Sequence, residues 1–120
     1  MTGVEIIAAE RTRQIEVEGF TPAHDDQWTG GALAEAAMAY AMPAKTIVVN
    51  VGGDDKFSIY LRINRNFFFP DDWGTEWWKP TDKNRIRELA KAGALIAAEI
   101  DRILRGLNLD DVHPADGEIE

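Results

Sequence analysis

Cysteine is absent from the sequence, and serine and histidine are almost absent. The 120 residues include no cysteine, one serine and two histidines. Without cysteine, the chain cannot form a disulfide, a thiolate nucleophile or a cysteine-based metal site. The serine, Ser58, has no histidine and acid at a recognisable catalytic spacing, and no glycine-rich phosphate loop occurs. We therefore expect no nucleophilic catalysis.

Long apolar runs are also missing. No segment approaches the roughly 20 apolar residues that cross a bilayer, so we expect no membrane partner. The first residues, MTGVEIIAAERTRQ, carry acids too early for the apolar part of a signal peptide. Together with the lack of cysteine, this favours a cytoplasmic location. The length and the hydrophobic content of 45% predict one globular domain, residues 1–107.

Positive charge is scarce at one end of the chain. Residues 108–120 contain five of the 21 acids and no lysine or arginine, which predicts a flexible acidic tail. The remaining 16 acids and 13 bases give the body a net charge of only -3, against -8 for the whole chain. Proteins that bind phosphate backbones carry clustered lysine and arginine, and no such cluster is present. We expect no nucleic-acid partner.

Two helices are predicted before residue 43. The first runs from about Val4 to Glu18, because Val4, Ile7, Ala8, Arg11 and Ile15 fall on one face. Gly19 is its expected stop, and Thr21-Pro22 predicts an extended turn. The second helix, GALAEAAMAYAM, starts at Thr29 or Gly30 and ends at Pro43.

The middle of the chain has a different character. Lys45 to Asn64 predicts a β-hairpin, because two runs rich in β-branched and aromatic residues flank Gly52-Gly53-Asp54-Asp55. Residues 65–80 hold six aromatic residues together with two prolines and a glycine, which predicts a loop that buries its rings.

The last helix is expected from a cap at Thr81 or Asp82 to Arg105, with Gly106 as its stop. Its apolar residues repeat every three or four positions, at Ile86, Leu89, Gly93, Ile96, Ile100, Ile103 and Leu107. This seam is expected to pack against the chain's own helices, and a homodimer through the same helix is the alternative. Gly93 predicts that a neighbouring backbone or ring comes close.

The fold class expected from these elements is mainly α: a small helical domain with a long C-terminal helix, an inserted β-hairpin and an aromatic loop.

The triplet His24-Asp25-Asp26 contains the residue types that a metallohydrolase uses. HD phosphohydrolases bind metals through such doublets, but the second histidine here, His113, lies in the acidic tail. MazG-type pyrophosphohydrolases need carboxylates spaced by helical turns, whereas Glu35 stands alone, and Glu99 and Asp101 point to different faces. We expect no metal or other cofactor, with His24, Asp25 and Asp26 as weak metal candidates.

A set of charged and aromatic residues forms the candidate ligand site. Its members lie on the first helix, in the following turn, and around WWKP: Arg11, Gln14, Asp25, Asp26, Trp77, Trp78, Lys79 and Arg85. One interpretation is structural, because an arginine in an apolar stripe usually pairs with a carboxylate. The other is a pocket in which tryptophans stack on a planar ligand while arginine or lysine holds its phosphate. We favour the structural interpretation for EGFTPAHDD.

Three stretches resemble a family of small proteins common in bacteriophages and prophages. They are Arg11 and Gln14 followed by EGFTPAHDD, then WWKP at Trp77–Pro80, then KAGALIAAEI. The resemblance covers about half of the chain and implies a phage-type protein acting in the host cytoplasm. More remotely, Arg11, Gly19-Phe20 and Asp25-Asp26 are similar to signature positions of the RyR domain. That module implies binding of a ligand or protein rather than catalysis.

These observations lead to three functional hypotheses. The first is a non-enzymatic, phage-type accessory protein that binds a nucleotide or nucleotide-derived small molecule in an Arg- and Trp-lined pocket. The alternative is a protein-interaction module that inhibits or modulates a host protein, such as a defence protein. The further alternative is a metal-dependent nucleotide phosphohydrolase of MazG-like or HD type.

Overall fold

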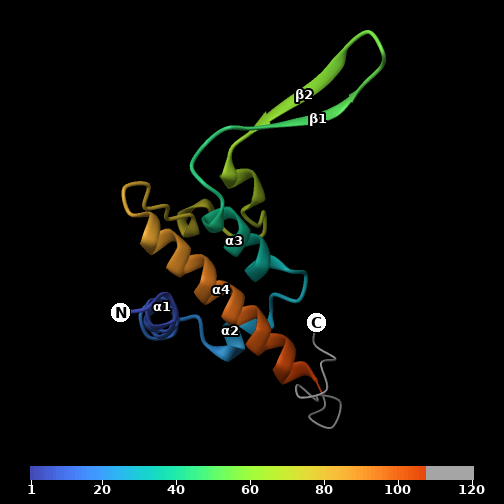
Figure 1. The fold of residues 1–120 in the computed structure, drawn as a ribbon. Coiled ribbons are helices and arrows are strands. Elements are labelled where there is room, and N and C mark those ends of the chain that lie inside the picture. The colour runs from blue at the N-terminus through green and yellow to red at the C-terminus, as the bar shows by residue number, and fades with distance from the viewer. Residues whose placement is uncertain (108–120) are drawn as a thin grey trace, which may run out of the picture.

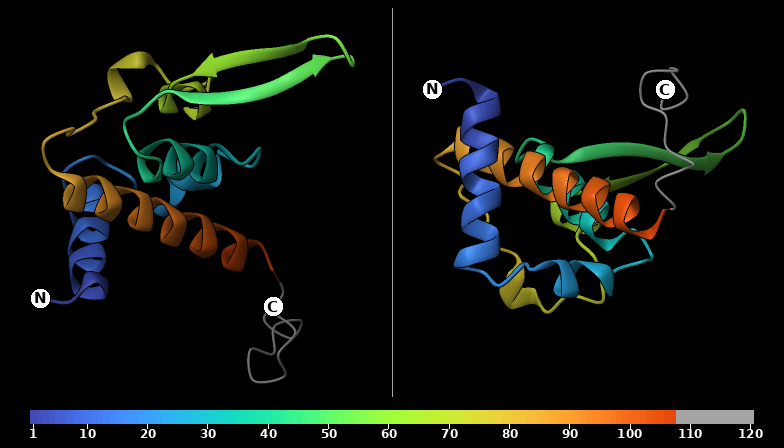
Figure 2. Two further views of the ribbon diagram at one scale, coloured as in Figure 1. Left: turned by 45° about the horizontal axis from the view of Figure 1, so that its top comes forward. Right: turned by 90° about the horizontal axis from the view of Figure 1, so that it is seen from below.

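A computed structural model describes residues 1–107, so the acidic tail and His113 lie outside the described residues (Figure 1). The elements follow one another as helices α1 (Gly3–Glu16), α2 (Pro22–Asp26) and α3 (Ala32–Ala41), strands β1 (Ile47–Gly53) and β2 (Ser58–Ile63), two 3-10 turns η1 (Arg65–Phe68) and η2 (Thr75–Trp77), and helix α4 (Arg85–Gly106). Helix α4 passes between α1 and α3, and the strands project away from all of them (Figures 1 and 2).

The fold class predicted from the sequence, mainly α, is wrong. Of the described residues, 54% are helical and 12% lie in strands, which makes the fold a mixed helix-plus-hairpin structure. The strands pair antiparallel with each other, Ile47 opposite Ile63 and Gly53 opposite Ser58. In the described part of the chain, no helix is both long and apolar enough to cross a membrane.

Helix α1 ends two residues earlier than predicted, and the predicted turn after it is partly helical. The Thr2 side chain and Glu5 cap the start of α1 reciprocally. Gly19 adopts a positive φ of 77°, which lets the Phe20 N–H donate to the Gln14 carbonyl at 2.9 Å. Thr21 then caps the single turn of α2, because its hydroxyl accepts from the His24 N–H at 3.3 Å.

Helices α3 and α4 begin later than predicted. Gly31 has a left-handed φ of 93°, so α3 starts only at Ala32 rather than at Thr29 or Gly30. Asn84, not Thr81 or Asp82, caps α4, because its side chain accepts from the Arg87 N–H at 3.1 Å. Helix α4 also includes Gly106, which was expected to lie just outside it.

Helix α4 buries its small residues rather than its apolar seam. The buried face consists of Ala90, Ala92, Ala94, Leu95 and Ala98, whereas Ile96, Ile100 and Ile103 are 48%, 52% and 46% exposed. The prediction that the seam packs against the chain's own helices is therefore wrong for these isoleucines. The physical reason is distance: alanine on both α3 and α4 lets the two backbones approach closely, which the longer isoleucines would prevent.

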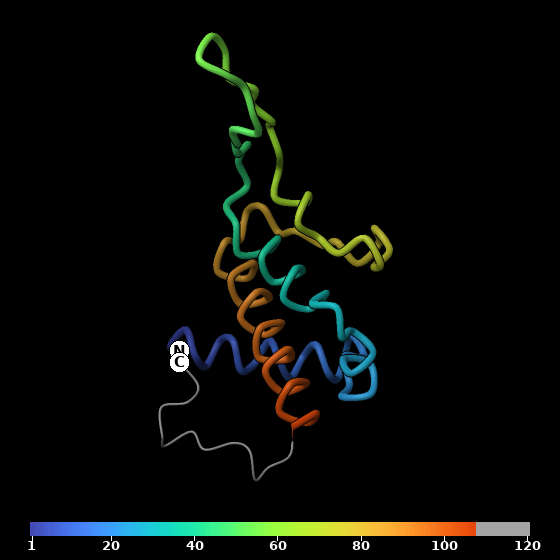
Figure 3. The backbone as a smooth tube through the Cα atoms, turned by 90° about the vertical axis from the view of Figure 1, so that its right-hand side faces the viewer, coloured from blue at the N-terminus to red at the C-terminus, as the bar shows by residue number. Residues whose placement is uncertain are grey.

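Helix α1 crosses the seam at Gly93 (Figure 3). A Cβ atom at Gly93 would lie 2.6 Å from Cδ1 of Ile7 and 2.9 Å from its Cγ1. The close neighbour is thus an aliphatic side chain, not the backbone or ring that the sequence led us to expect. Because α1 occupies the seam here, helix pairing along the whole of α4 is blocked, and a homodimer through this helix stays a prediction only for Ile96–Leu107.

The substitution Gly93→Ala tests this crossing. Alanine is favoured over glycine in a helix interior by about 1 kcal/mol. With Ile7 in place, the contact between the added methyl group and Ile7 should cancel or reverse this gain in the free energy of unfolding. In an Ile7→Ala background, the gain in stability should appear. Urea unfolding of the four chains in a double-mutant cycle measures the difference. Equal effects of Gly93→Ala in both backgrounds would show that α1 does not press on Gly93.

A buried carboxylate ties the start of α4 to the aromatic loop. Glu88 is 1% exposed and accepts from Arg65 at 2.6 Å and from the Thr81 N–H at 3.1 Å. Arg65, itself 5% exposed, also reaches Asp82 at 2.6 Å. The hydrogen bond from Arg65 holds the pKa of Glu88 below its ordinary value. The pair therefore joins η1, the segment before α4, and α4 itself.

We expect Glu88→Gln to destabilise the fold by about 3–5 kcal/mol, the usual effect of removing one partner of a buried ion pair. The contribution of Glu88 is complete above its ordinary pKa of 4.5 and is lost as the pH falls through its lowered value. Asp82→Asn is the matched control, since the Asp82 side chain is 68% exposed and should contribute less than about 1 kcal/mol. Similar losses for both variants in urea unfolding would contradict this assignment.

Candidate functional site

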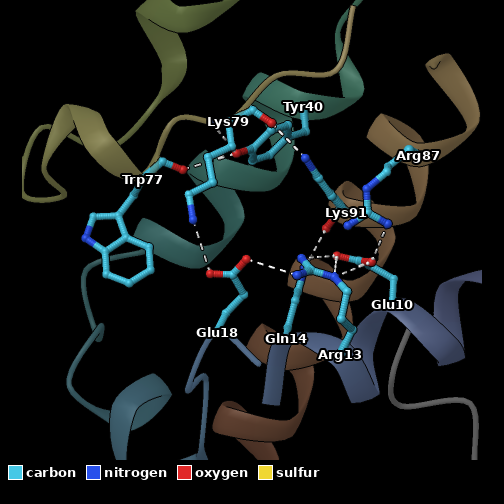
Figure 4. Close-up of polar contacts among 9 residues, drawn as sticks. All are labelled: Glu10, Arg13, Gln14, Glu18, Tyr40, Trp77, Lys79, Arg87 and Lys91. Atoms are coloured by element: carbon cyan, nitrogen blue, oxygen red, sulfur yellow. Dashed lines mark hydrogen bonds and ion pairs between the residues drawn. The ribbon is translucent and has the colours of Figure 1, made fainter. Parts of the chain in front are cut away.

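The aromatic loop and helix α1 enclose a small cavity next to α4 (Figure 4). Its volume is about 40 Å³, room for a few water molecules or one small polar group. We call it the basic cavity. Its lining comes from α1, α3, α4 and the loop: Arg13, Gln14, Glu18, Phe20, Tyr40, Trp73, Trp77, Lys79, Lys91 and Leu95.

Lys91 lies on the buried alanine face of α4 and is 8% exposed. Its ammonium donates to the Lys79 carbonyl at 2.7 Å and lies 5.5 Å from the centre of the Tyr40 ring. An ammonium has three donors, and within the described residues the Lys79 carbonyl is its one acceptor. Burial lowers the pKa of Lys91 because it disfavours the charged form. The basic cavity thus contains a desolvated cation with unused hydrogen-bonding capacity.

Gln14 adds an unpaired polar atom to the same cavity. Its side chain is buried, and its amide nitrogen is 3.5 Å from the Lys91 carbonyl. Its amide oxygen is buried and has no hydrogen-bond partner among the described residues. Buried polar atoms without partners are rare in folded proteins, so this oxygen and the Lys91 ammonium mark a position for a bound polar group or water.

Tyr40 holds the loop over the cavity. Its hydroxyl donates to the Trp77 carbonyl at 3.2 Å and accepts from the Lys79 N–H at 3.0 Å. Burial raises the pKa of Tyr40, so the phenol stays protonated and keeps both roles at neutral pH. The Lys79 ammonium lies 5.5 Å from the Trp77 ring centre, close enough for a cation–π contact.

A chain of ion pairs starts in the wall of the basic cavity and continues beyond it to Glu10 and Arg87, as Figure 4 shows. Arg13 bridges Glu10 at 2.7 Å and Glu18 at 3.0 Å, and Glu18 also pairs with Lys79 at 3.3 Å. Arg87 pairs with Glu10 at 3.1 Å. The hydrogen bond from Arg13 lowers the pKa of Glu18. With Lys91, these six side chains carry four positive and two negative charges, so the neighbourhood of the cavity favours an anion.

A second pocket of about 200 Å³ is bordered by some of the same rings. We call it the aromatic pocket, and it is lined by Phe20, His24, Trp28, Asp72, Trp73, Gly74 and Trp77. Phe20, Trp73 and Trp77 therefore line both spaces. Phe20 and His24 stack with centres 4.6 Å apart, which fixes the floor of the pocket. The indole nitrogens of Trp28 and Trp73 are buried and have no partner among the described residues.

The structure divides the predicted ligand site. Gln14, Trp77 and Lys79 meet in the basic cavity. Trp78 faces elsewhere: it packs against Tyr40 at 4.8 Å between ring centres and lies 5.4 Å from the Arg65 guanidinium. Arg85 donates to the last carbonyls of α3, those of Tyr40, Ala41 and Met42. It therefore caps a helix rather than lining either pocket.

The EGFTPAHDD segment forms a salt-bridge lock between helices. Arg11 pairs with the fully buried Asp25 at 2.9 Å, and Arg105 pairs with Asp26 at 2.7 Å. His24 Nδ1 lies 2.8 Å from the other oxygen of Asp25. Both Asp25 oxygens are thus engaged within the fold. Among residues 1–107, no group of three or more histidine, aspartate or glutamate side chains could hold a metal ion.

Sequence reasoning missed three main residues of the basic cavity: Arg13, Tyr40 and Lys91. Lys91 carried a usable signal, because it is flanked by Ala90, Ala92 and Ala94, a stretch of small residues suited to burial. A lysine on such a face is unexpected unless it has a partner or a role. Tyr40 had no comparable signal, since its two hydrogen bonds reach residues 37 and 39 positions away.

Comparisons with protein-family models, with curated proteins and with solved structures find no match to this chain. The resemblances to a phage family and to the RyR domain therefore stay predictions. The functional assignment depends on the geometry of the two pockets.

The substitution Lys91→Met tests whether this lysine is a functional rather than a stabilising group. Methionine has a similar length and removes a desolvated charge, so we expect an unchanged or higher Tm at pH 7. Because the folded pKa of Lys91 is lowered, the unfolded chain binds more protons just below pH 10.5, and wild-type stability should rise there with pH. Lys91→Met should lack this rise.

Thermal unfolding between pH 7 and 10 measures both effects, with the exposed Lys83→Met as the control. Lys91 would have a purely structural role if Lys91→Met lost much of its stability and its stability still rose with pH as that of the wild type does.

Proposed function

We propose that this chain is a non-enzymatic binding protein for a small anionic molecule with a planar ring, and that a nucleotide or nucleotide-derived molecule is the best candidate. The observation that supports this most is the position of Trp77. This residue lines both the basic cavity and the aromatic pocket. A ligand with an anionic group and a planar ring would contact Trp77 with both groups.

The basic cavity suits the anionic group. Its volume of about 40 Å³ is too small for a nucleobase, but it can admit part of a phosphate. Lys91 and Lys79 supply cations, and Lys91 has donors to spare. A charge-assisted hydrogen bond to a buried ammonium is stronger than one between neutral groups, so an anion would offset the desolvation of Lys91.

The aromatic pocket suits the planar group. Its volume of about 200 Å³ is bordered by the rings of Phe20, His24, Trp28, Trp73 and Trp77. Stacking of a base on aromatic side chains contributes about 1–3 kcal/mol per base and tolerates different bases.

We propose, from the sequence resemblance alone, that this binding protein is a phage-type accessory protein. The alternative, a module that binds and modulates a host protein, is favoured by one observation: Ile96, Ile100 and Ile103 remain about half exposed on α4. Exposed apolar patches of this kind are frequent at protein interfaces. If the chain acts by binding a host protein, the basic cavity and the aromatic pocket should be dispensable for function.

Binding of mono-, di- and cyclic nucleotides at millimolar concentration tests the proposal by thermal shift and calorimetry. A ligand that binds the folded chain raises its Tm by mass action. We expect at least one nucleotide to bind, Lys91→Met to weaken it at least about 10-fold, and Trp77→Ala to weaken it about 5- to 150-fold, the loss of one stacked ring.

Lys83→Met and Trp77→Phe serve as controls, because the first lies outside both pockets and the second keeps a ring for stacking. Arg85→Ala is not a suitable probe, since Arg85 caps α3. If no nucleotide shifts the Tm, or if Lys91→Met binds as tightly as the wild type, the proposal is wrong.

A further inference from the structure

The hairpin β1–β2 is an arm that leaves the body of the protein. Figures 1, 2 and 3 all show it extending away from the helices. Every residue from Val48 to Arg62 is exposed, including Val49, Leu61 and Phe57 at 39%, 46% and 60%. A two-stranded hairpin with no covering layer is only marginally stable in water. The arm therefore needs a partner for its apolar side chains.

The strand register shows that the arm has one apolar and one polar face. Ile47 faces Ile63 and Val49 faces Leu61, and Ile59 lies on the same side of β2. The opposite face carries Val48 beside Arg62 and Asn50 beside Tyr60. This alternation is typical of a sheet that buries one face against a second layer. No second layer comes from the rest of the described chain, because Val49, Ile59 and Leu61 stay 39–48% exposed.

Charge is distributed unevenly along the arm. The tip carries Asp54, Asp55 and Lys56, a net charge of -1, and the base carries Lys45 and Arg62, a net charge of +2. None of these five side chains forms an ion pair within the described residues. The net charge at the tip of one arm is thus complementary to that at the base of an identical arm that runs in the opposite direction, although Arg62 lies on the polar face and would not contact an arm stacked on the apolar face.

We propose that two copies of this chain form a homodimer by stacking the apolar faces of their arms antiparallel, tip against base. A two-fold axis brings the same patch together with itself, so the patch must be self-complementary. The arm meets this condition twice, since its apolar face contains no charge and its two ends carry opposite net charge. The β-bulge at Val51 disturbs the β1 edge, which favours face-to-face stacking over edge pairing.

The oligomeric state of the ligand-free chain tests the apolar face. Sedimentation equilibrium should give twice the chain mass for the wild type and a monomer for Leu61→Glu. Tyr60→Glu, one position away on the polar face, is the matched control and should stay dimeric. Helical circular dichroism should be unchanged in both, because the arm lies apart from the helices. A monomeric wild type at several hundred micromolar, or a dimeric Leu61→Glu, would overturn the proposal.

Charge reversal tests the antiparallel orientation and the identity of the partner. One variant combines Asp54→Asn with Asp55→Lys, which makes the tip +2 while an amide oxygen still caps the turn, as Asp54 does for Lys56 N at 2.8 Å. The other combines Lys45→Glu with Arg62→Glu, which makes the base -2. Each variant then repels itself, since its tip and base carry the same sign, and its dimer should weaken at least about 10-fold.

An equimolar mixture of the two variants should form a heterodimer, because each tip then meets a base of opposite sign. Native mass spectrometry distinguishes the heterodimer from either homodimer, since the two variants differ in mass. Two variants that stay monomeric when mixed, or that each still form homodimers as tightly as the wild type, would show that the arms do not pair tip to base.

Discussion

The ion pair between Glu88 and Arg65 is the interaction on which the rest of the structure depends. Both side chains are buried, and the same carboxylate accepts the Thr81 N–H. Glu88 therefore ties the start of α4 to the end of the hairpin and to the segment that carries Lys79. Residues 65–81 contain no α-helix or strand, so their other constraints are the hydrogen bonds to Tyr40 and Lys91 and the packing of their rings against the core. The ion pair thus positions the loop that closes both pockets.

The core explains why so many polar groups are buried. Alanines dominate the contact between α3 and α4, which brings these helices close but provides little apolar volume. Beside the Ile7–Gly93 contact, the buried side chains between α1 and α4 are long and polar, namely Glu10, Gln14 and Lys91. Glu10 is fully used by Arg13 and Arg87, whereas Gln14 and Lys91 keep unpaired capacity. The proposed site for an anion and these unpaired polar groups therefore occupy the same position, as expected where stability is exchanged for function.

Much of the local structure could be predicted from particular residues. Gly19 stops α1, the β-branched runs form the hairpin, and the repeat in residues 86–107 is helical. Three of eight predicted ligand residues, Gln14, Trp77 and Lys79, reach the basic cavity. The choice of face on α4 could not be predicted, because hydrophobicity favours the isoleucines whereas close helix packing favours the alanines. Arg85 was misassigned for a similar reason: a cation at a helix start can bind a ligand or cap another helix's carbonyls.

The sequence by itself determined the hairpin, the three longer helices to within a few residues and the exclusion of thiolate chemistry, because these depend on residue type and short spacing. It favoured a salt-bridge lock at EGFTPAHDD with Arg11 as one partner, but the partner of Asp26 is Arg105, 79 residues away. Only the tertiary structure decided which surfaces are buried and which groups meet. Lys91 and Gln14 are 77 residues apart, and Tyr40 contacts a loop about 38 residues away. These long-range contacts depend on how closely two helix backbones approach each other. That distance is set by the side-chain volumes of both helices together, and the spacing of apolar residues along one helix does not contain it.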